Sequence, residues 1–492
     1  MAGLGVVFAA IWGFTAFLSG SPAHAATDTG PKIGDVINAT NTAWTLVAAF
    51  LVFFMQAGFM MLEAGFARQR ETVNVLLECI VDTALCGILF WAFGFSFMFG
   101  TGNGVIGHQY FFLNNAPLTY GSTGVAFMAY FLFQFAFADT CSTITSGAMV
   151  GRTGFKGDLY YSVAVSGIIY PILGHWVWGP DGWLATLKTP FRDFAGSTVV
   201  HTVGGMIALC GAIALGPRLG RKFKRDGGAM PPGHDMTIAA VGGVILWFGW
   251  YGFNPGSTLS AMDAAGIGRV ATNTTLAACG GALAALFFVY PRSKVWDTGM
   301  TINGFLAGLV AITAPCYWVN ATGAIMIGAI AGFLTPLGID LLEHFRVDDP
   351  IGAVAVHGFC GIFGTLSIGL FATGQYGVPG MNGADTTVKI KGLFWGGGTK
   401  QLMVQILGSG VITGACLVVG FALMYAVKAT GTLRVSEEIE REGLDLREHG
   451  GGAYHFEFGL SSLTLPSTSG RGNRVPASVG SERTHNSLSN VP

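Results

Sequence analysis

Charged residues are scarce in this sequence, since Asp, Glu, Lys and Arg make up only 11% of the 492 residues. A soluble domain carries roughly 25% charged residues, so this chain has too few charges to cover a water-facing surface. Hydrophobic residues reach 51%. Apolar runs of about 18 residues or more recur, and each can cross a hydrocarbon core of about 30 Å as a helix. The composition excludes a soluble globular protein and indicates an all-α polytopic membrane protein.

A dominant basic patch is also missing, because the formal net charge is −1. This balance argues against nucleic acid as a partner. The eight cysteines are scattered singly, mostly inside apolar runs, with no Cys-x-x-Cys pair. We interpret them as small core residues rather than as disulfides or metal ligands.

Eleven stretches of the sequence are predicted to cross the membrane as helices. They lie near residues 43–67, 73–100, 122–150, 158–178, 198–216, 236–254, 270–290, 299–314, 321–342, 350–371 and 400–427. Twelve Lys and Arg residues fall in the loops on one side and six on the other. The positive-inside rule makes the twelve-charge side cytoplasmic, with the N-terminus outside and the C-terminus inside. We expect the protein in the cell membrane, either a plasma membrane or a bacterial inner membrane.

The two ends of the chain differ from the predicted membrane domain, 43–428. Residues 1–25 are predicted to be a signal peptide, because an apolar stretch precedes the small-x-small pattern Ala23-His24-Ala25. An uncleaved first helix is the alternative, since Lys and Arg are missing from the start of the chain. Residues 429–458 are charged and are predicted to form a cytoplasmic C-terminal segment. Residues 459–492 are rich in Ser, Thr, Gly, Asn and Pro, which predicts a disordered tail.

An internal repeat divides the membrane domain. Residues 193–205 and 349–361 share the motif D-x2-G-x3-V-H-x3-G and open the fifth and the tenth predicted spans. Spans that are an odd number apart run in opposite directions. The sequence therefore predicts two inverted five-helix repeats plus a C-terminal helix, an arrangement found in many transporters.

Ionisable residues inside a membrane are costly and usually face a pore or a partner. His201 and His357 occupy matching positions of the repeat, so a two-fold axis would bring them together near the midplane. A neutral pair could share a proton. A metal site is the alternative, but no third ligand is convincingly placed beside them. Asp193 is predicted to accept backbone N–H bonds at a helix start and also to attract a cation. We expect these three residues to stand alone as the intramembrane ionisable set.

Aromatic residues near two span ends have more than one interpretation. Trp178 is either an interfacial tryptophan or a cation–π site worth ~0.5–2 kcal/mol. The run from Trp247 to Ser257 ends in Asn-Pro-Gly-Ser, which we expect to expose amide and hydroxyl groups.

Taken together, these runs resemble the ammonium transporter family (Amt/Mep/Rh), Amt type, over nearly the whole chain. The motifs that carry the resemblance are Phe-Gln-Phe-Ala-Phe at 133–137, Asp-Phe-Ala-Gly-Ser-Thr-Val-Val-His at 193–201, Trp-Tyr-Gly-Phe-Asn-Pro-Gly-Ser at 250–257, Arg-Val-Asp-Asp-Pro at 346–350 with His-Gly-Phe-Cys-Gly at 357–361, and the charged tail at 433–445.

The resemblance implies ammonium transport: NH4+ is recruited outside and deprotonated, and NH3, with H+, passes along a pore. It implies a homotrimer in the lipid bilayer, methylammonium as a second substrate, a PII-type cytoplasmic regulator and a regulatory role for residues 429–458. It implies no enzyme activity, catalytic residue, metal or cofactor. The implied site residues are Trp178, Phe133, Ser257 and Asp193 for the cation, Phe137 and Phe253 for the pore gate, His201 and His357 for the proton relay, and Tyr170, Trp250 and Thr313 in support.

Three positions depart from the family pattern. Gly151 stands where the family usually has an acidic residue before Arg152. Asp139 follows Phe137 by two residues, or ~200° on a helix, so it should face away from the lumen, toward another helix or a subunit contact. Arg447 replaces the regulatory threonine of plant forms, so control by phosphorylation is not expected there.

Three other functions remain open alternatives. These are an ammonium sensor or transceptor with little flux, a neutral NH3 gas channel of the Rh kind, and a membrane enzyme that uses the histidine pair. Against the enzyme alternative, the sequence contains no nucleophile or cofactor motif that would accompany the histidine pair.

Overall fold

The computed structural model describes residues 30–380 and 383–454. The predicted signal peptide, 1–25, and the predicted disordered tail, 459–492, lie outside the described residues.

Helices make up most of the described chain. The α-helices are α2 (Ile33–Phe66), α3 (Thr72–Leu89), α4 (Phe95–Phe99), α5 (Phe127–Gly147), α6 (Phe155–Ala164), α7 (Tyr170–Trp178), α8 (Val203–Leu215), α9 (Met236–Phe253), α10 (Ala264–Ser293), α11 (Thr298–Thr313), α12 (Ala321–His344), α13 (Cys360–Phe371), α14 (Lys400–Ala429), α15 (Glu437–Glu442) and α16 (Leu444–His449).

Short helical turns extend or join these helices. The π-helical turns are η2 (Phe90–Gly94), η4 (Val165–Ile169), η5 (Ser197–Thr202) and η8 (Val354–Phe359). The 3₁₀ turns are η1 (Gln69–Glu71), η3 (Phe111–Leu113), η6 (Lys224–Asp226), η7 (Pro255–Thr258) and η9 (Leu393–Trp395). Two small antiparallel hairpins pair β1 (Thr119–Tyr120) with β2 (Val125–Ala126), and β3 (Val378–Gly380) with β4 (Gly383–Asp385).

Nine helical segments of the described chain are long and apolar enough to cross a membrane. They match nine of the predicted spans. The two remaining predicted spans are helical as well, as the run from α6 to α7 and as the shorter apolar helix α11. The first predicted span, 43–67, corresponds to α2, which starts earlier, at Ile33. Hydropathy marks where the hydrocarbon core begins, and a helix can extend beyond it into water.

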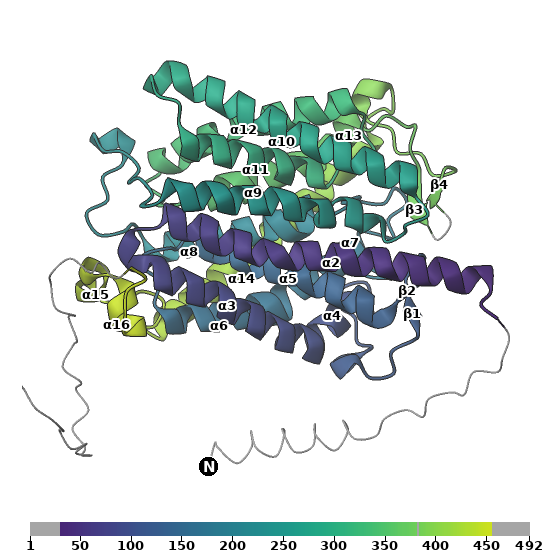
Figure 1. Ribbon diagram of the computed structural model, residues 1–492, viewed down its shortest axis with the longest axis horizontal. Helices are drawn as coiled ribbons and strands as arrows, with labels where there is room; N and C mark the ends of the chain where they lie inside the picture. The colour runs from purple at the N-terminus through teal and green to yellow at the C-terminus, as the bar shows by residue number, and fades with distance from the viewer. Residues whose placement is uncertain (1–29, 381–382, 455–492) are drawn as a thin grey trace, which may run out of the picture. The chain divides into compact units, whose positions relative to one another are not determined.

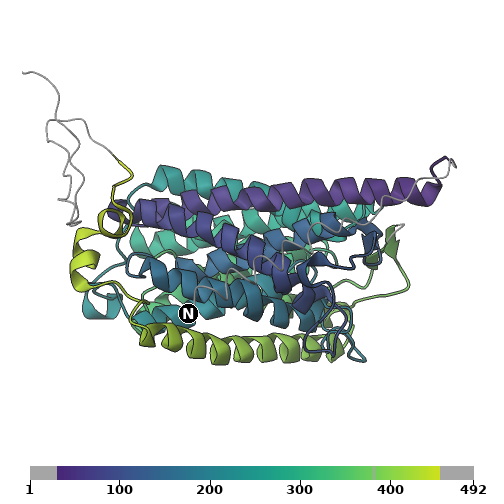
Figure 2. The same ribbon diagram turned by 90° about the horizontal axis from the view of Figure 1, so that it is seen from below.

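The long helices of the described chain run side by side (Figure 1). Helix α2 packs along α9, and α10, α11 and α12 form a neighbouring group (Figure 1). In the turned view, α14 runs along the edge opposite α2 (Figure 2). The β-hairpins gather at one end of the helices and α15 and α16 at the other, and we call these the hairpin end and the tail end.

Glycines allow this close packing. A β-carbon at Gly242 of α9 would collide with the backbone of α2 at Leu62, and one at Gly281 of α10 would collide with Gly304 of α11. In lipid there is little hydrophobic drive between helices, so close backbone approach supplies much of the association energy.

Candidate functional site

The segment from Asp193 folds as a capped turn. Its carboxylate accepts four backbone N–H bonds, from Gly196, Ser197, Thr198 and Val199, at 2.8 to 3.0 Å. These donors are the free N–H groups that open η5, where a helix start favours a negative charge. The predicted capping role of Asp193 is confirmed by these bonds, whereas its role toward a cation stays a prediction.

The segment from Asp349 folds in the same way. Its carboxylate accepts bonds from Gly352 and Ala353 at 3.1 and 3.0 Å and from Val354 at 2.9 Å, and so opens η8. Gly352 has φ +84°, and Gly196, its counterpart, has φ +117°. Both lie in the left-handed region that favours glycine, which explains the first glycine of the repeated motif.

The last glycine of each motif copy lies where two helical segments, η5 with α8 and η8 with α13, come into backbone contact. A β-carbon at Gly205 would collide with the backbone of Gly358, and one at Gly361 would lie 2.5 Å from Ser197 O. Only glycine fits at either place. Each copy of the motif therefore supplies a cap, a left-handed turn, a histidine and a point of backbone contact.

This backbone contact brings the two histidines together. Nδ1 of His357 lies 3.2 Å from Nδ1 of His201. His201 is fully buried, His357 is 7% exposed, and the rings are 5.2 Å apart. In a neutral pair, one Nδ1 carries a proton and the other accepts it, so the two imidazoles must be opposite tautomers. Nε2 of His201 has no hydrogen-bond partner within the described residues.

Aromatic rings continue from His201 toward the hairpin end. Phe253 lies 5.4 Å from the His201 ring and stacks on Phe137 at 4.0 Å, with 26° between the two phenyl planes. Phe137 in turn lies 4.6 Å from Phe133 and 6.1 Å from Trp178. The two predicted gate rings are therefore placed directly between Trp178 and the histidine pair.

Each of the three residues predicted for a cation site contacts Phe137 or Phe253. Phe133 and Trp178 both contact Phe137, whereas Ser257 donates its hydroxyl proton to Phe253 O at 2.7 Å. Trp178 is half-buried and its indole N–H donates to Asp193 O at 2.8 Å. The indole orientation is thus tied to the residue that caps η5.

Asn254 corrects one expectation from the sequence. The amide was predicted to be exposed, but Asn254 is fully buried and donates to Thr274 Oγ at 3.0 Å. The end of helix α9 therefore lies inside the protein, where Asn254 Oδ1 has no hydrogen-bond partner within the described residues.

The supporting residues take different positions. The Trp250 ring lies 5.2 Å from the His201 ring, and its indole N–H donates to Thr313 Oγ at 2.8 Å. This bond fixes one wall beside the histidine. Tyr170 is fully buried, and its hydroxyl has no hydrogen-bond partner within residues 30–380 and 383–454.

Two arginines at the tail end, Arg152 and Arg218, bind the backbone and the side chain of Asp348, next to Asp349. Arg152 is fully buried and donates to the carbonyls of Val150, Gly216 and Asp348. The Asp348 carboxylate accepts two bonds from the Arg218 guanidinium, at 2.8 and 2.9 Å. Burial alone would raise the pKa of Asp348, but Arg218 and Arg152 hold that pKa well below its usual range.

A carboxylate from another element occupies the space beside Gly151. A β-carbon at Gly151 would lie 2.7 Å from Glu71 Oε2, so a carboxylate of η1 fills that space. Glu71 forms an ion pair with Arg68, which donates to Gly151 O at 3.1 Å. A carboxylate therefore lies beside position 151, from η1 rather than from the residue before Arg152.

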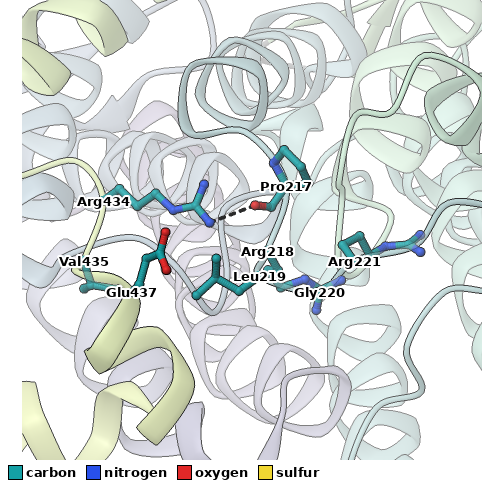
Figure 3. Close-up of a pocket in the computed structure, with 8 residues that line it drawn as sticks. All are labelled: Pro217, Arg218, Leu219, Gly220, Arg221, Arg434, Val435 and Glu437. Carbon is teal, nitrogen blue, oxygen red and sulfur yellow. Dashed lines mark hydrogen bonds between the residues drawn. The ribbon is translucent and has the colours of Figure 1, made fainter.

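The C-terminal segment docks at the tail end. Arg434 donates to Pro217 O at 2.8 Å (Figure 3). The same guanidinium pairs with Glu440 at 2.8 Å. An open pocket lies beside these bonds and is lined by Pro217, Arg218, Leu219, Gly220, Arg221, Arg434, Val435 and Glu437.

Helix α16 contacts the start of α3. Asp445 accepts the Asn74 backbone N–H at 3.0 Å, and His449 Nε2 donates to Asn74 Oδ1 at 2.8 Å. Arg447 pairs with Glu438 and Glu442 of the same segment.

Five further carboxyl groups in the predicted spans are buried, so Asp193, His201 and His357 do not stand alone, and all but Asp139 were missed in the sequence. They are at most 3% exposed, and they are Glu63, Glu78, Asp82, Asp139 and Asp158. Asn74 donates to Glu78 at 2.8 Å, and Ser142 donates to Asp82 at 3.5 Å. Asp139 lies between helices, near Gln56 and Thr83, as its place on α5 predicted. Within the described chain, no three His, Cys, Asp or Glu side chains are arranged to hold a metal ion.

Sequence comparisons identify relatives along most of the chain. Residues 43–454 match the model of the Ammonium Transporter Family. Ammonium transporter Amt2 of Archaeoglobus fulgidus is 43% identical over 421 residues, covering 84% of this chain and 87% of the relative. Ammonium transporter 1 member 2 of Arabidopsis thaliana is 39% identical, covering 80% of this chain and 79% of the relative.

Solved structures share the fold. A protein described as a sensor Amt protein matches with a TM-score of 0.76 at 36% identity, covering 85% of this chain and all of the other. Mep2 of Saccharomyces cerevisiae matches with a TM-score of 0.75 at 27% identity, covering 85% and 97% of the two chains. This chain belongs to the Ammonium Transporter Family, a family of multi-pass membrane transporters.

Proposed function

We propose that this protein transports ammonium through the column of rings that runs from Trp178 past Phe137 and Phe253 to His201 and His357. The observation that carries the proposal is the contact of the two histidine Nδ1 atoms, 3.2 Å apart, directly beneath stacked phenyl rings. An apolar column with one polar pair in its middle suits a small solute that loses its charge on entry.

Capture takes place at the hairpin end. The partly exposed face of Trp178 attracts a cation through its ring quadrupole, and the Ser257 hydroxyl oxygen accepts a hydrogen bond from it. Asp193 adds an electrostatic attraction although its oxygens are occupied by backbone N–H groups. The cation cannot go further intact, because an isolated ion in a low-dielectric tube would lose tens of kcal/mol of hydration energy.

Proton loss follows beneath Phe137 and Phe253. An N–H bond of NH4+ breaks, and the proton joins the accepting Nε2 of His201. The proton on His201 Nδ1 moves to His357 Nδ1, and the Nε2 proton of His357 leaves toward the tail end. NH3 passes the pair and is protonated again beyond it. Each transfer inverts both tautomers, so the pair must reset before the next proton.

The membrane topology is part of the proposal. Eleven helices cross the bilayer: the nine apolar segments, the run from α6 to α7, and α11. The matching turns at Asp193 and Asp349 support two inverted repeats with α14 as the extra helix. The hairpin end then faces outward, and the tail end, with Arg152 and Arg218, faces the cytoplasm by the positive-inside rule.

The assembly and the partners are part of the proposal, and the family resemblance is what supports them. We propose a homotrimer with one pore per subunit, a C-terminal segment that touches the neighbouring subunit, and a PII-type protein as a regulator of the cytoplasmic face. Methylammonium is the second substrate, since it keeps a cationic N–H group.

A sensor is the second candidate, because one structural neighbour at 36% identity is described as a sensor Amt protein. A sensor would bind ammonium with little flux. A neutral gas channel of the Rh kind would conduct NH3 without charge and would have no need of Trp178 as a cation trap.

Ammonium concentration jumps on liposomes containing the purified protein separate these functions. The proposal predicts a saturable current with ammonium and a smaller one with methylammonium. Internal alkalinisation without current would identify a gas channel, and saturable binding without either signal would identify a sensor.

A further inference from the structure

Gln405 of α14 holds the backbone that leads into the capture site. It is fully buried on a membrane-spanning helix. Its Oε1 accepts the Arg192 N–H at 2.9 Å, and its Nε2 donates to Arg192 O at 2.6 Å and to Thr365 O at 3.1 Å. One side chain thus satisfies both backbone polar groups of Arg192, as a neighbouring β-strand would.

Arg192 directly precedes Asp193. Both the backbone carbonyl and the side-chain carboxylate of Asp193 bond to parts of the proposed capture site. The carbonyl accepts the Trp178 indole N–H at 2.8 Å, and the carboxylate caps η5, which carries His201. Fixing the peptide before Asp193 therefore fixes the indole and the start of the histidine turn together.

Other contacts orient Gln405 itself. Gln401, one turn earlier, donates to Gln405 Oε1 at 2.9 Å and to Pro190 O at 3.2 Å. A β-carbon at Gly408, one turn later, would collide with the Phe191 ring, so this ring is seated on the helix backbone. Three successive turns of α14, at Gln401, Gln405 and Gly408, therefore contact segment 190–192.

A buried glutamine in a lipid-crossing helix is costly unless its hydrogen bonds are used. If this position served only for packing, an apolar side chain such as leucine would fill it without that cost. Building on the ammonium transport proposed above, we infer that Gln405 is a positioning residue for the capture site, setting the affinity for the ammonium cation by holding Asp193 and Trp178 in place.

Gln405→Met tests the inference, since it keeps the volume and removes every bond. We expect the half-saturation concentration for ammonium to rise about three- to tenfold, as expected when one or two net hydrogen bonds are lost. The maximal current per folded protein should stay within about twofold, because neither histidine is touched. Gln405→Glu keeps an acceptor for the Arg192 N–H and should shift half-saturation less. Thr413→Val, on the same helix, is the control and should shift nothing.

A second readout does not depend on transport. The backbone amides of 196–199 donate hydrogen bonds to the Asp193 carboxylate. Hydrogen exchange at these amides should be faster in Gln405→Met than in Thr413→Val. An unchanged half-saturation together with unchanged exchange, or a fall only in the amount of folded protein, would overturn the inference.

Two further outcomes keep the inference separate from the proposed function. If Gln405→Met does not fold, Gln405→Glu and Gln401→Met decide by the same two readouts, and wild-type values in both would overturn it. If the wild-type protein gives no ammonium current, the transport proposal fails, and amide exchange at 196–199 alone decides whether Gln405 positions Asp193.

Discussion

The turns at Asp193 and Asp349 share one design but have different surroundings. Each has a capping carboxylate, a glycine of positive φ, a π-helical turn and a buried histidine. Beside Asp193 lies the indole of Trp178, which bonds to its carbonyl. Beside Asp349 lies Asp348, which Arg218 holds in an ion pair.

Under the proposed transport function, the difference separates two tasks of the same backbone. The shared parts place His201 and His357 against each other. In that proposal, the surroundings decide which solute enters at each end. An aromatic face with no arginine bond suits cation capture, whereas a carboxylate locked by guanidinium groups suits a fixed frame.

The largest difference between the two turns is expected when the capping carboxylates are removed. Asp193→Ala and Asp349→Ala should each lower stability by about 2–3 kcal/mol, because each frees several buried N–H groups from a charged acceptor. Transport per folded protein should fall more than about tenfold for Asp193→Ala, equivalent to over 1.4 kcal/mol, and much less for Asp349→Ala. Thermal unfolding in detergent and current measurements check both. Equal losses of transport would contradict the division of tasks.

The ion pair at Asp348 should show its own pH dependence. Its pKa is lower in the folded protein than in the unfolded chain, so the pair stabilises fully above the ordinary pKa of about 4 and is lost as pH falls below it. Asp348→Asn should remove about 1–3 kcal/mol at neutral pH and flatten the stability curve in acid. Unfolding temperatures from pH 7 to pH 3 test this, and parallel curves for the two proteins would refute it.

Trp178→Leu should change the hairpin end alone. The loss of a cation–π contact worth ~0.5–2 kcal/mol predicts a ~2- to 30-fold rise in the half-saturation for ammonium. Unfolding temperature should change little, since the ring is half-buried. Current against ammonium concentration gives the answer, with Trp176→Leu as a control on the same helix. An unchanged half-saturation would count against the cation site.

The smallest effect is expected where the C-terminal segment docks. Burial lowers the pKa of His449 from 6.5 in the docked state, although Asp445 and Glu448 oppose this shift. Undocked His449 therefore binds protons first, and docking weakens as pH falls below that value. Hydrogen exchange of residues 444–449 should be faster at pH 5.5 than at pH 7.5. The same acceleration in His449→Gln, which can still donate to Asn74, would show that another group is responsible.

The sequence predicts the contact of the two histidines better than the surroundings of that contact. His201 and His357 are recognisable because a motif with fixed offsets repeats, and each part of that motif has a local structural task. The membrane helices are predictable for a similar reason, since hydropathy is a local property. The start of α2 is not, because a helix can extend beyond the membrane.

Long-range packing explains what the sequence does not predict. Glu63, Glu78, Asp82, Asp139 and Asp158 come from four helices, and only their packing brings them close. One signal was available, because Glu78 and Asp82 are four residues apart and share a helix face. The contact between Glu71 and Gly151 was equally hidden, since it joins two segments that are far apart in the sequence.

The central claim is that the histidine pair relays a proton during ammonium transport. The most direct measurement is the ammonium-driven current of wild type, His201→Ala and His357→Ala on solid-supported membranes, with each protein checked for folding. We predict a saturable current in the wild type and a loss of about tenfold or more in either variant. Wild-type current in both variants would contradict the claim.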